Sequence, residues 1–306
     1  MKRIFILLLG LTVLLSACFA PKPGEGATAD GVSFTDARGH SVTVSGDDGV
    51  VACSGSFAQT WMLSGGRLAG TTSDSFEDGL VSSGEAADVG GVHEPNLEQI
   101  LALQPKLVIL SGDIPGHIKL YDSLSAAGIQ TAYFSVETFD DYLAMLKIFT
   151  SVTGRSDLYD QNGLQVRAKI DAVIQKAKDI PSPKILLVRA GAGKVTARGS
   201  DTMAGTILKD LGCVNIADTD NSLLDDLSME VIIGEDPDFI FATVMGDEQK
   251  GQKALENSLQ NNPAWNGLSA VKNNRYVLLP KDLFHQKPND RWAESYEVLW
   301  DILYGT

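Results

Sequence analysis

The sequence is short of positive charge. Its 306 residues include 25 Lys and Arg against 39 Asp and Glu, and the formal net charge is −14 at pH 7. Residues 1–17 contain Lys2 and Arg3 and no acid, so the rest of the chain is more acidic still. A chain this acidic is a poor partner for nucleic acid, and we exclude that class of function.

Long apolar runs are also missing, apart from one at the N-terminus. Ile4–Leu15 is apolar, follows Met1-Lys2-Arg3, and is too short to span a membrane. These features predict a signal peptide over residues 1–17. The remainder, about 275 residues, is long enough for two domains with their own cores.

The residues that end the apolar run resemble a lipobox. Leu15-Ser16-Ala17-Cys18 is similar to the motif at which bacterial lipoproteins are cleaved and lipidated on cysteine. We therefore expect Cys18 to anchor an extracytoplasmic protein to the cell membrane. Residues 18–31 are rich in Pro, Gly and Ala, which favours a flexible tether. Ordinary cleavage near Ala20 is the alternative.

Cysteine and histidine are scarce. After Cys18 only Cys53 and Cys213 remain, in different halves of the chain, which favours buried free thiols over a disulfide. The sequence has four histidines and no His-rich loop, and this counts against a carrier of bare Zn or Mn ions. The four are His40, His93, His117 and His285.

Common catalytic motifs are absent. The sequence has no Gly-x-Ser-x-Gly elbow and no His-Glu-x-x-His zinc motif. Gly191-Ala192-Gly193-Lys194 is similar to a phosphate-binding loop but lacks its spacing and the Ser or Thr after lysine. We predict no catalytic residue, no metal site and no cofactor. A surface lipoprotein enzyme is the weaker alternative.

A short unit occurs twice. Asn96-Leu97-Glu98 is followed by a proline and by the apolar run Leu107–Leu110, and Ser228-Met229-Glu230 is followed by a proline and Phe239–Ala242. The glutamate and the proline are seven residues apart in both copies. Each copy predicts a capping residue, a short helix with an acid in its first turn, and a buried strand. The repeat indicates two similarly built lobes with a cleft between them.

Strand and helix patterns alternate through both halves, which predicts an α/β fold with mainly parallel sheets. The longest helical pattern runs from Ser156 to about Asp179 and is ended by prolines. We expect it to be a rigid connector between the lobes. The predicted organisation is an N-terminal lobe over 32–154, a connecting helix over 155–180 and a C-terminal lobe over 181–306.

Several phrases resemble one family. The chain is similar, over nearly all of its length after the tether, to the substrate-binding lipoproteins of ABC importers for iron complexes, haem and cobalamin. Their lobes are joined by one long helix. The phrases that carry the resemblance are Val89-Gly90-Gly91, Glu94-Pro95-Asn96-Leu97-Glu98, Leu103–Ile109, Leu208–Gly212, Asn262–Trp265 and Val271–Arg275.

The resemblance implies a role for the repeated acids. In this family each lobe presents a glutamate to a basic pocket on the membrane subunits of the importer, and by position these match Glu98 and Glu230. Exposed carboxylates far apart on one face can fix orientation and speed docking. The alternative is that each only complements its helix dipole, a contribution of about 0.3–1 kcal/mol.

We expect the ligand to lie on loops that leave the strand ends and face the cleft. His93 and His285 fall one in each lobe, and imidazole can ligate iron or donate to a carboxylate. Arg189 and Arg291 could clamp anionic groups, unless each forms a salt bridge within its lobe. The full set of predicted ligand-binding residues is Ser56, Phe57, His93, Glu94, Arg189, Arg198, Met245, His285, Arg291 and Trp292. Trp61, one helical turn behind the first loop, fits the core better than the pocket wall.

The sequence thus predicts a monomeric protein that captures an iron chelate, haem or a corrinoid outside the membrane. Its partners would be the small-molecule metal chelate, the membrane subunits of an ABC importer, and the membrane itself through the lipid anchor. The nearest alternative is an importer lipoprotein that binds Zn or Mn ions.

Overall fold

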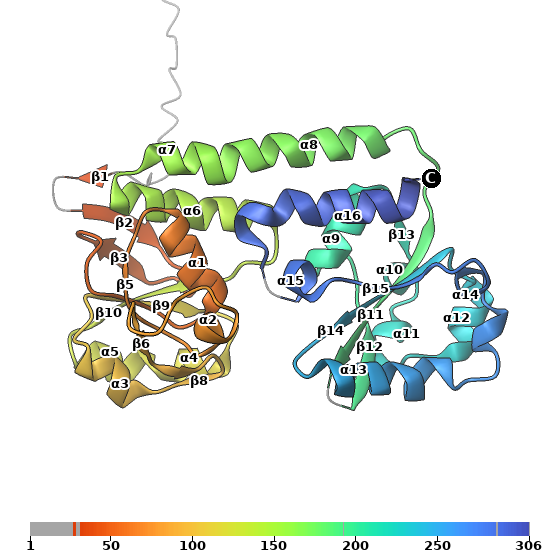
Figure 1. Cartoon of the computed structure of the whole chain (residues 1–306), viewed down its shortest axis with the longest axis horizontal. Coiled ribbons are helices and arrows are strands. Elements are labelled where there is room, and N and C mark those ends of the chain that lie inside the picture. Colours follow the sequence, from red (N-terminus) through yellow and green to blue (C-terminus); the bar gives the residue numbers. More distant parts are fainter. Residues whose placement is uncertain (1–26, 29–30, 192, 286, 306) are drawn as a thin grey trace, which may run out of the picture.

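The computed structural model describes residues 27–28, 31–191, 193–285 and 287–305. The signal peptide predicted over residues 1–17 and the lipidation of Cys18 lie outside this part of the chain. Two α/β lobes lie side by side beneath one long helical run (Figure 1). None of the helices within the described ranges is both long and apolar enough to cross a bilayer.

The N-terminal lobe is built on a five-stranded sheet in which every pair is parallel, in the order β10-β9-β4-β5-β6. The central strands are apolar and buried along their length, as strands covered on both faces must be. A separate antiparallel sheet is formed by β1, β2 and β3. The strands are β1 (Ala27–Thr28), β2 (Gly31–Thr35), β3 (Ser41–Val44), β4 (Val50–Ala52), β5 (Leu68–Thr71), β6 (Ala87–Asp88), β9 (Leu107–Ser111) and β10 (Gln130–Phe134), with the small pair β7 (Gly90–Gly91) and β8 (Glu94–Pro95).

Short helices connect these strands. The segment that starts at Pro115 forms two helices that meet at Leu120, where the backbone N–H donates back to the carbonyl of His117 in a tighter turn. The helix that follows β10 starts with a capping box at Thr138 and ends at Gly154, whose backbone is left-handed. The helices are α1 (Gly55–Leu63), α2 (Asp74–Glu77), α3 (Leu97–Ala102), α4 (Pro115–Lys119), α5 (Tyr121–Ala126) and α6 (Phe139–Thr153).

The C-terminal lobe has a mixed sheet in the order β12-β11-β14-β15, and β13 also pairs with β11. Only β12 is antiparallel to its neighbour. The strands are β11 (Lys184–Gly191), β12 (Lys194–Ala197), β13 (Val214–Asn215), β14 (Phe239–Val244) and β15 (Tyr276–Leu278). The helices are α9 (Met203–Asp210), α10 (Ile216–Thr219), α11 (Ser222–Asp225), α12 (Met229–Glu235), α13 (Glu248–Leu255), α14 (Ser269–Lys272), α15 (Lys281–Phe284) and α16 (Trp292–Tyr304).

The two copies of the repeated unit adopt the same local structure. The side chains of Asn96 and Ser228 accept hydrogen bonds from backbone N–H groups of α3 and α12, as predicted for N-caps. The residue before the proline is left-handed in both, with φ of 47° at Gln104 and 41° at Asp236. The strands that follow, β9 and β14, pair in parallel with the first strand of their own sheet. The repeat therefore marks equivalent places in the two lobes.

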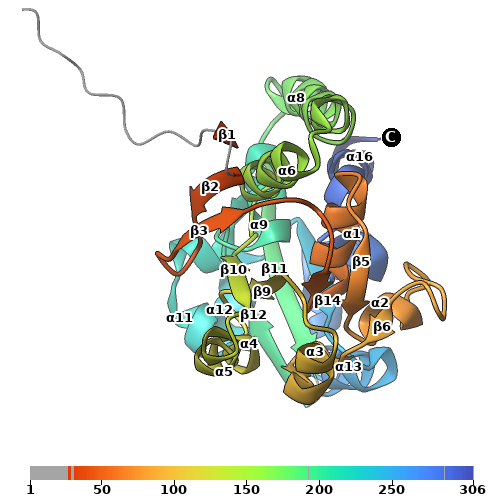
Figure 2. The ribbon, with the colours of Figure 1, turned by 90° about the vertical axis from the view of Figure 1, so that its left-hand side faces the viewer.

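The long helix begins at Ser156 as predicted and runs to Ala177, but it is not α-helical throughout. A π-helical turn over Asp160–Leu164 separates α7 (Ser156–Tyr159) from α8 (Gln165–Ala177). The wider turn coincides with close packing on α6, where a Cβ added at Gly163 would lie 2.6 Å from Leu143. Figure 2 shows α8 above α6, and α16 lies to one side of these two helices and contacts α8.

A second connection joins the lobes beside the long helix. The ring of Trp292, at the start of α16, packs against Phe139 and Tyr142 of α6. The amide of Asn289 donates to the backbone carbonyl of Ser56 at 3.0 Å and to Gln59 at 2.6 Å, both on α1. Part of the C-terminal lobe is thus fixed directly to the N-terminal one.

Candidate ligand cleft

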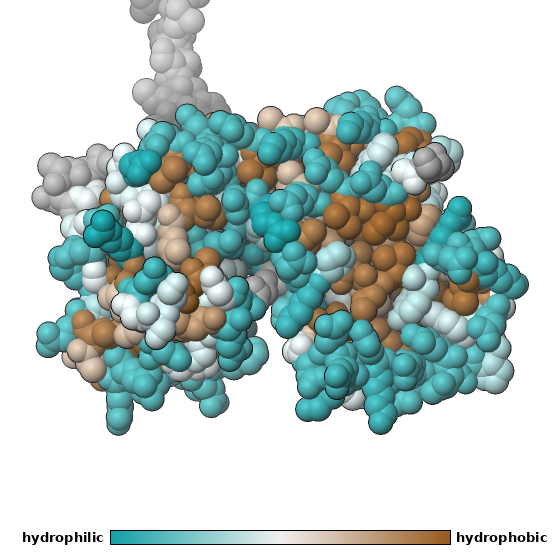
Figure 3. Space-filling view, viewed as in Figure 1, coloured by the Kyte–Doolittle hydropathy of each residue, from teal (hydrophilic) through white to brown (hydrophobic). Residues whose placement is uncertain are grey.

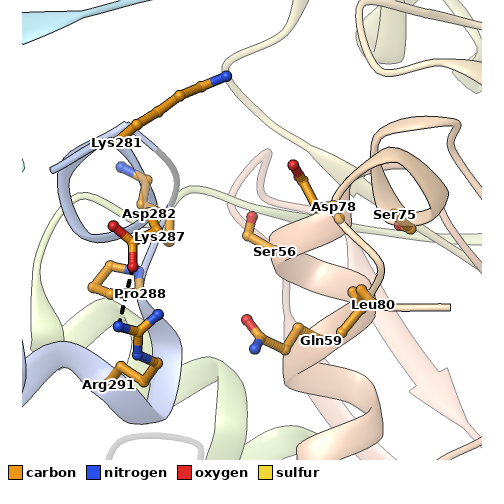
Figure 4. A pocket seen from close by; sticks show the side chains of 11 residues that line it. Ser56, Gln59, Ser75, Asp78, Leu80, Lys281, Asp282, Lys287, Pro288 and Arg291 are labelled. Carbon is orange, nitrogen blue, oxygen red and sulfur yellow. Dashed lines mark ion pairs between the residues drawn. The ribbon is translucent and has the colours of Figure 1, made fainter.

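The larger of two hollows between the lobes has a volume of about 520 Å³. Residues of the N-terminal lobe face residues of the C-terminal lobe across it (Figure 4). Ser56 and Gln59 come from α1, whose N-terminus opens onto the hollow. The other lining residues are Gly55, Ser75, Asp78 and Leu80 on one side, and Lys281, Asp282, Lys287, Pro288 and Arg291 on the other.

The smaller hollow has a volume of about 290 Å³ and lies against the end of the C-terminal sheet. Among the described residues, Glu137 is the only one from the N-terminal lobe that lines it, and Lys287 lines both hollows. We therefore treat the two hollows as one cleft. The remaining lining residues are Arg189, Arg198, Asp201, Thr202, Met203, Met245, Phe284 and His285. In the space-filling view the furrow between the lobes is bordered largely by hydrophilic residues (Figure 3).

Arg189 and Arg198 are neighbours on paired strands. Arg189 lies on β11 and Arg198 directly follows β12, and the N–H of Arg198 donates to the carbonyl of Leu187 at 2.8 Å. The Nε atoms of both arginines are buried and have no hydrogen-bond partner within the described residues. Burial, and then the charge of Arg198, lower the pKa of Arg189, while Glu137 acts in the opposite direction. Two adjacent cations with unused donors favour an anionic ligand.

His285 lines the same hollow and is half-buried. Its Nδ1 lies 3.0 Å from the carbonyl oxygen of Val244. A carbonyl can only accept, so Nδ1 carries the proton and Nε2 keeps a free lone pair. Burial lowers the pKa of His285, which keeps the ring neutral at pH 7. Such an imidazole can ligate a metal or accept a hydrogen bond.

Arg291 reaches the larger hollow but is already engaged by two acids. Its guanidinium lies 2.8 Å from Glu294 and 3.1 Å from Asp282, and the second pair is visible in Figure 4. The hydrogen bond to Glu294 is the main cause that raises the pKa of Arg291. The alternative of a salt bridge within the lobe therefore describes Arg291, whereas Arg189 has no ion pair within the described residues.

His93 and Glu94 are exposed and line a different hollow of about 610 Å³, formed by the N-terminal lobe alone. It lies between α2, α4 and β8, on the side of this lobe that faces the other lobe (Figure 1). The loop is pressed onto α4, because a Cβ at Gly116 would lie 1.9 Å from the carbonyl oxygen of His93. Buried His117 holds it further, since Nε2 donates to the Val92 carbonyl at 2.6 Å. The structure thus does not bring His93 and His285 into one hollow.

Phe57 and Trp292 were predicted to touch the ligand, but the structure places both in the core. Phe57 is 5% exposed and packs against Phe134, and Trp292 is 1% exposed. Neither lines the described hollows. Trp61 is fully buried, as its position suggested, and its indole donates to the Arg67 carbonyl at 2.9 Å.

Sequence reasoning missed several lining residues. Gln59 is one turn after Ser56 on the same helix face, and this spacing could have indicated it. Lys287 lies between α15 and α16, two residues after the predicted His285, and this proximity could have indicated it. Asp78 follows α2 and carried no signal. Within the ranges that the structure describes, no group of three or more His, Cys, Asp or Glu is placed to hold a metal ion.

Glu98 and Glu230 are both exposed and line none of the described hollows. Each stands in the first turn of its helix, α3 or α12. Figure 1 shows α3 at the lower end of the N-terminal lobe and α12 on the outer side of the C-terminal lobe. The geometry leaves both carboxylates accessible and away from the cleft.

Two lobes, a bridging helix and a cleft define the class of bilobed binding proteins. Residues 50–283 match the family described as "Periplasmic binding protein", and the chain belongs to this family. Its members are substrate-binding proteins rather than enzymes.

Among curated proteins, the chain is similar to the Fe(3+)-citrate-binding protein YfmC of Bacillus subtilis. The two are 29% identical over 206 residues, which is 66% of this chain and 62% of the relative. The ferric-anguibactin-binding protein FatB of Vibrio anguillarum is 23% identical over 210 residues, 66% of this chain and 64% of that relative. The chain thus matches somewhat less than two thirds of the length of these relatives.

Among solved structures, Staphylococcus aureus SirA complexed with staphyloferrin B superimposes with a TM-score of 0.67. The two sequences are 23% identical, and the superposition covers 89% of this chain and 97% of the SirA chain. This likeness shows the fold, with two lobes as predicted.

Proposed function

We propose that this protein captures an anionic ferric chelate outside the cell membrane and delivers it to an ABC importer. The observation that carries the proposal is the pair Arg189 and Arg198, two adjacent cations that line the cleft and whose buried Nε donors have no partner in the described chain. Guanidinium groups bind carboxylates and related oxyanions in a bidentate manner. The names of the relatives, which bind ferric citrate and ferric anguibactin, support a ferric ligand.

The predicted ligand residues divide accordingly. Arg189, Arg198, Met245 and His285 would contact the chelate from the C-terminal lobe, and Ser56 from α1. His93 and Glu94 would act at the edge of the cleft. Haem also carries carboxylates that the arginines could bind, and a corrinoid is a further candidate for the family's cleft.

The direct test is a titration of the purified protein, followed by tryptophan fluorescence. Ferric citrate, ferric siderophores, haem and cobalamin form one arm, and Zn²⁺ and Mn²⁺ form the other. Trp292 directly follows Arg291, which lines the larger hollow, so binding should quench its emission. We expect a ferric chelate to bind more tightly than about 10 μM. Tighter binding of bare Zn²⁺ or Mn²⁺ than of any chelate would overturn the proposal.

We also propose that the protein works as a monomer, anchored by lipid on Cys18 after loss of residues 1–17. The anchor rests on the lipobox resemblance, and the composition of 18–31 suits a tether. Expression with a labelled fatty acid should label the wild-type protein. Cys18→Ser should abolish the label and release the protein from membranes. Labelling of the serine variant would contradict the proposed anchor.

Docking is proposed to use Glu98 and Glu230, which are exposed at equivalent places in the two lobes. Since they line no part of the cleft, docking and ligand binding can be varied independently. This separation is used in a prediction below.

A further inference from the structure

Glu137 occupies an unusual place in the cleft. It comes just after the end of β10 and before Thr138, which caps α6, and its own N–H donates to Asp141 at 3.1 Å. No other described residue of the N-terminal lobe lines the smaller hollow. Its backbone is therefore held at the rim while its carboxylate reaches toward the opposite lobe.

The carboxylate of Glu137 pairs with Lys287 across the cleft. The Oε1 to Nζ distance is 3.1 Å, and the side chains are 54% and 24% exposed. The negative charge of Glu137 also favours the charged form of Arg189. Lys287 is the residue shared by both hollows, so the pair lies where a ligand that filled the whole cleft would pass.

We propose that Glu137 is a specificity-determining residue that stands in for the ligand's anion while the cleft is empty. This inference rests on the proposed function, an anionic chelate bound by the C-terminal lobe. An incoming anion must take Lys287 from Glu137 and must overcome the repulsion of that carboxylate. A chelate with several negative charges can do so, because it also gains Arg189 and Arg198. A neutral chelate of similar size meets no repulsion from Glu137 and has no charge with which to take Lys287, so it leaves the pair in place.

The size of the effect follows from exposure. Partly exposed ion pairs contribute little, so removing the competitor should change affinity by about three- to fivefold rather than by orders of magnitude. The direction is opposite to that of an ordinary ligand contact. Deleting a contact weakens binding, whereas deleting a competitor strengthens it.

The test measures binding of ferric citrate, as a multiply charged chelate, and of a neutral ferric trihydroxamate to four proteins. Glu137→Gln should bind ferric citrate about three- to fivefold more tightly than wild type and should leave any binding of the neutral chelate unchanged. Glu137→Asp keeps the charge and should show no comparable gain. Glu248→Gln, an exposed acid at the start of α13, is the matched control and should behave as wild type.

The outcomes separate this inference from the proposed function. If wild type binds no ferric chelate or haem, the proposed function fails. If wild type binds ferric citrate and Glu137→Gln binds it equally or more weakly, the stand-in role is wrong, and weaker binding would make Glu137 a ligand contact. An equal gain for neutral and anionic chelates would also overturn the inference, because it would show a loosened cleft rather than relief of charge competition.

Discussion

The two walls of the cleft differ in charge and in origin. The N-terminal wall is formed by α1, α2 and the Glu137 loop; it presents hydroxyl, amide and acidic groups and no Lys or Arg among its described lining residues. The C-terminal wall carries five cationic side chains, Arg189, Arg198, Lys281, Lys287 and Arg291. Under the proposed function, the C-terminal lobe would supply the attraction for an anion and the N-terminal lobe would shape the site.

The largest expected effect comes from removing the contact between α16 and α6, which connects the two lobes. Trp292→Ala removes a fully buried ring that packs on Phe139 and Tyr142. We expect the free energy of unfolding to fall by about 3–5 kcal/mol, as for other large core truncations. Urea denaturation would measure it. Trp300→Ala, at a less buried position of the same helix, is the control and should cost less; equal losses would contradict the special role of Trp292.

The second prediction concerns the cationic wall. Arg189→Met with Arg198→Met should weaken binding of an anionic ferric chelate by about 100-fold, because two charge-assisted interactions are lost. Arg155→Met with Arg275→Met, at positions that line neither hollow, is the matched control. Isothermal titration would give both affinities. A loss below threefold in the double variant would show that the charge of the wall does not hold the ligand.

The third prediction separates the cleft from the outer surface. Glu98→Ala with Glu230→Ala should reduce uptake into reconstituted vesicles by at least about tenfold and leave ligand affinity within about twofold. Asp122→Ala with Glu248→Ala also removes one exposed first-turn acid from each lobe, and uptake should persist. Normal uptake by the first variant at limiting protein concentration would reduce the repeat to an architectural feature.

The smallest effect should come from His117, which holds the His93 loop against α4. Burial is the main cause that lowers its pKa below 6.5, so the folded protein binds this proton less readily than the unfolded chain. Stability contributed by neutral His117 is present above about pH 6.5 and is lost as the pH falls below it, by at most about 1.4 kcal/mol per pH unit. Urea midpoints at pH 7.5 and 5.5 should differ more in wild type than in His117→Gln. Equal differences would contradict this assignment.

The fold could be predicted further than the site. Apolar runs, caps and the Glu–Pro spacing indicated β9, β14 and their helices, since these are local signals. The order of strands in a sheet depends on contacts between distant parts of the sequence. For this reason the sequence did not reveal that His93 lies away from the α1 end of the cleft. Its loop follows β6, the edge strand two places from β4, about 10 Å along the sheet from the α1 end of the cleft.

The direction in which an aromatic side chain points also could not be predicted from the sequence around it. Trp292 shares its segment with His285 and Lys287, yet it turns toward α6 while they face the cleft. The pair of Glu137 with Lys287 joins residues 150 positions apart and left no pattern in the sequence. Of the cationic C-terminal wall, the three arginines were predicted from the sequence, whereas Lys281 and Lys287 were not.

The bond from Asn289 to α1 has a mechanical consequence. If the long helix were the only connection, one lobe could rotate relative to the other about any axis through that helix. With a second attachment at Ser56 and Gln59, two points are fixed, and the remaining easy motion is a rotation about the line that joins them. The expected opening and closing of the lobes is therefore a hinge rotation through a small angle about one axis. Small-angle scattering with and without ferric citrate should show only a slight change in radius of gyration, and a domain-scale closure would contradict this.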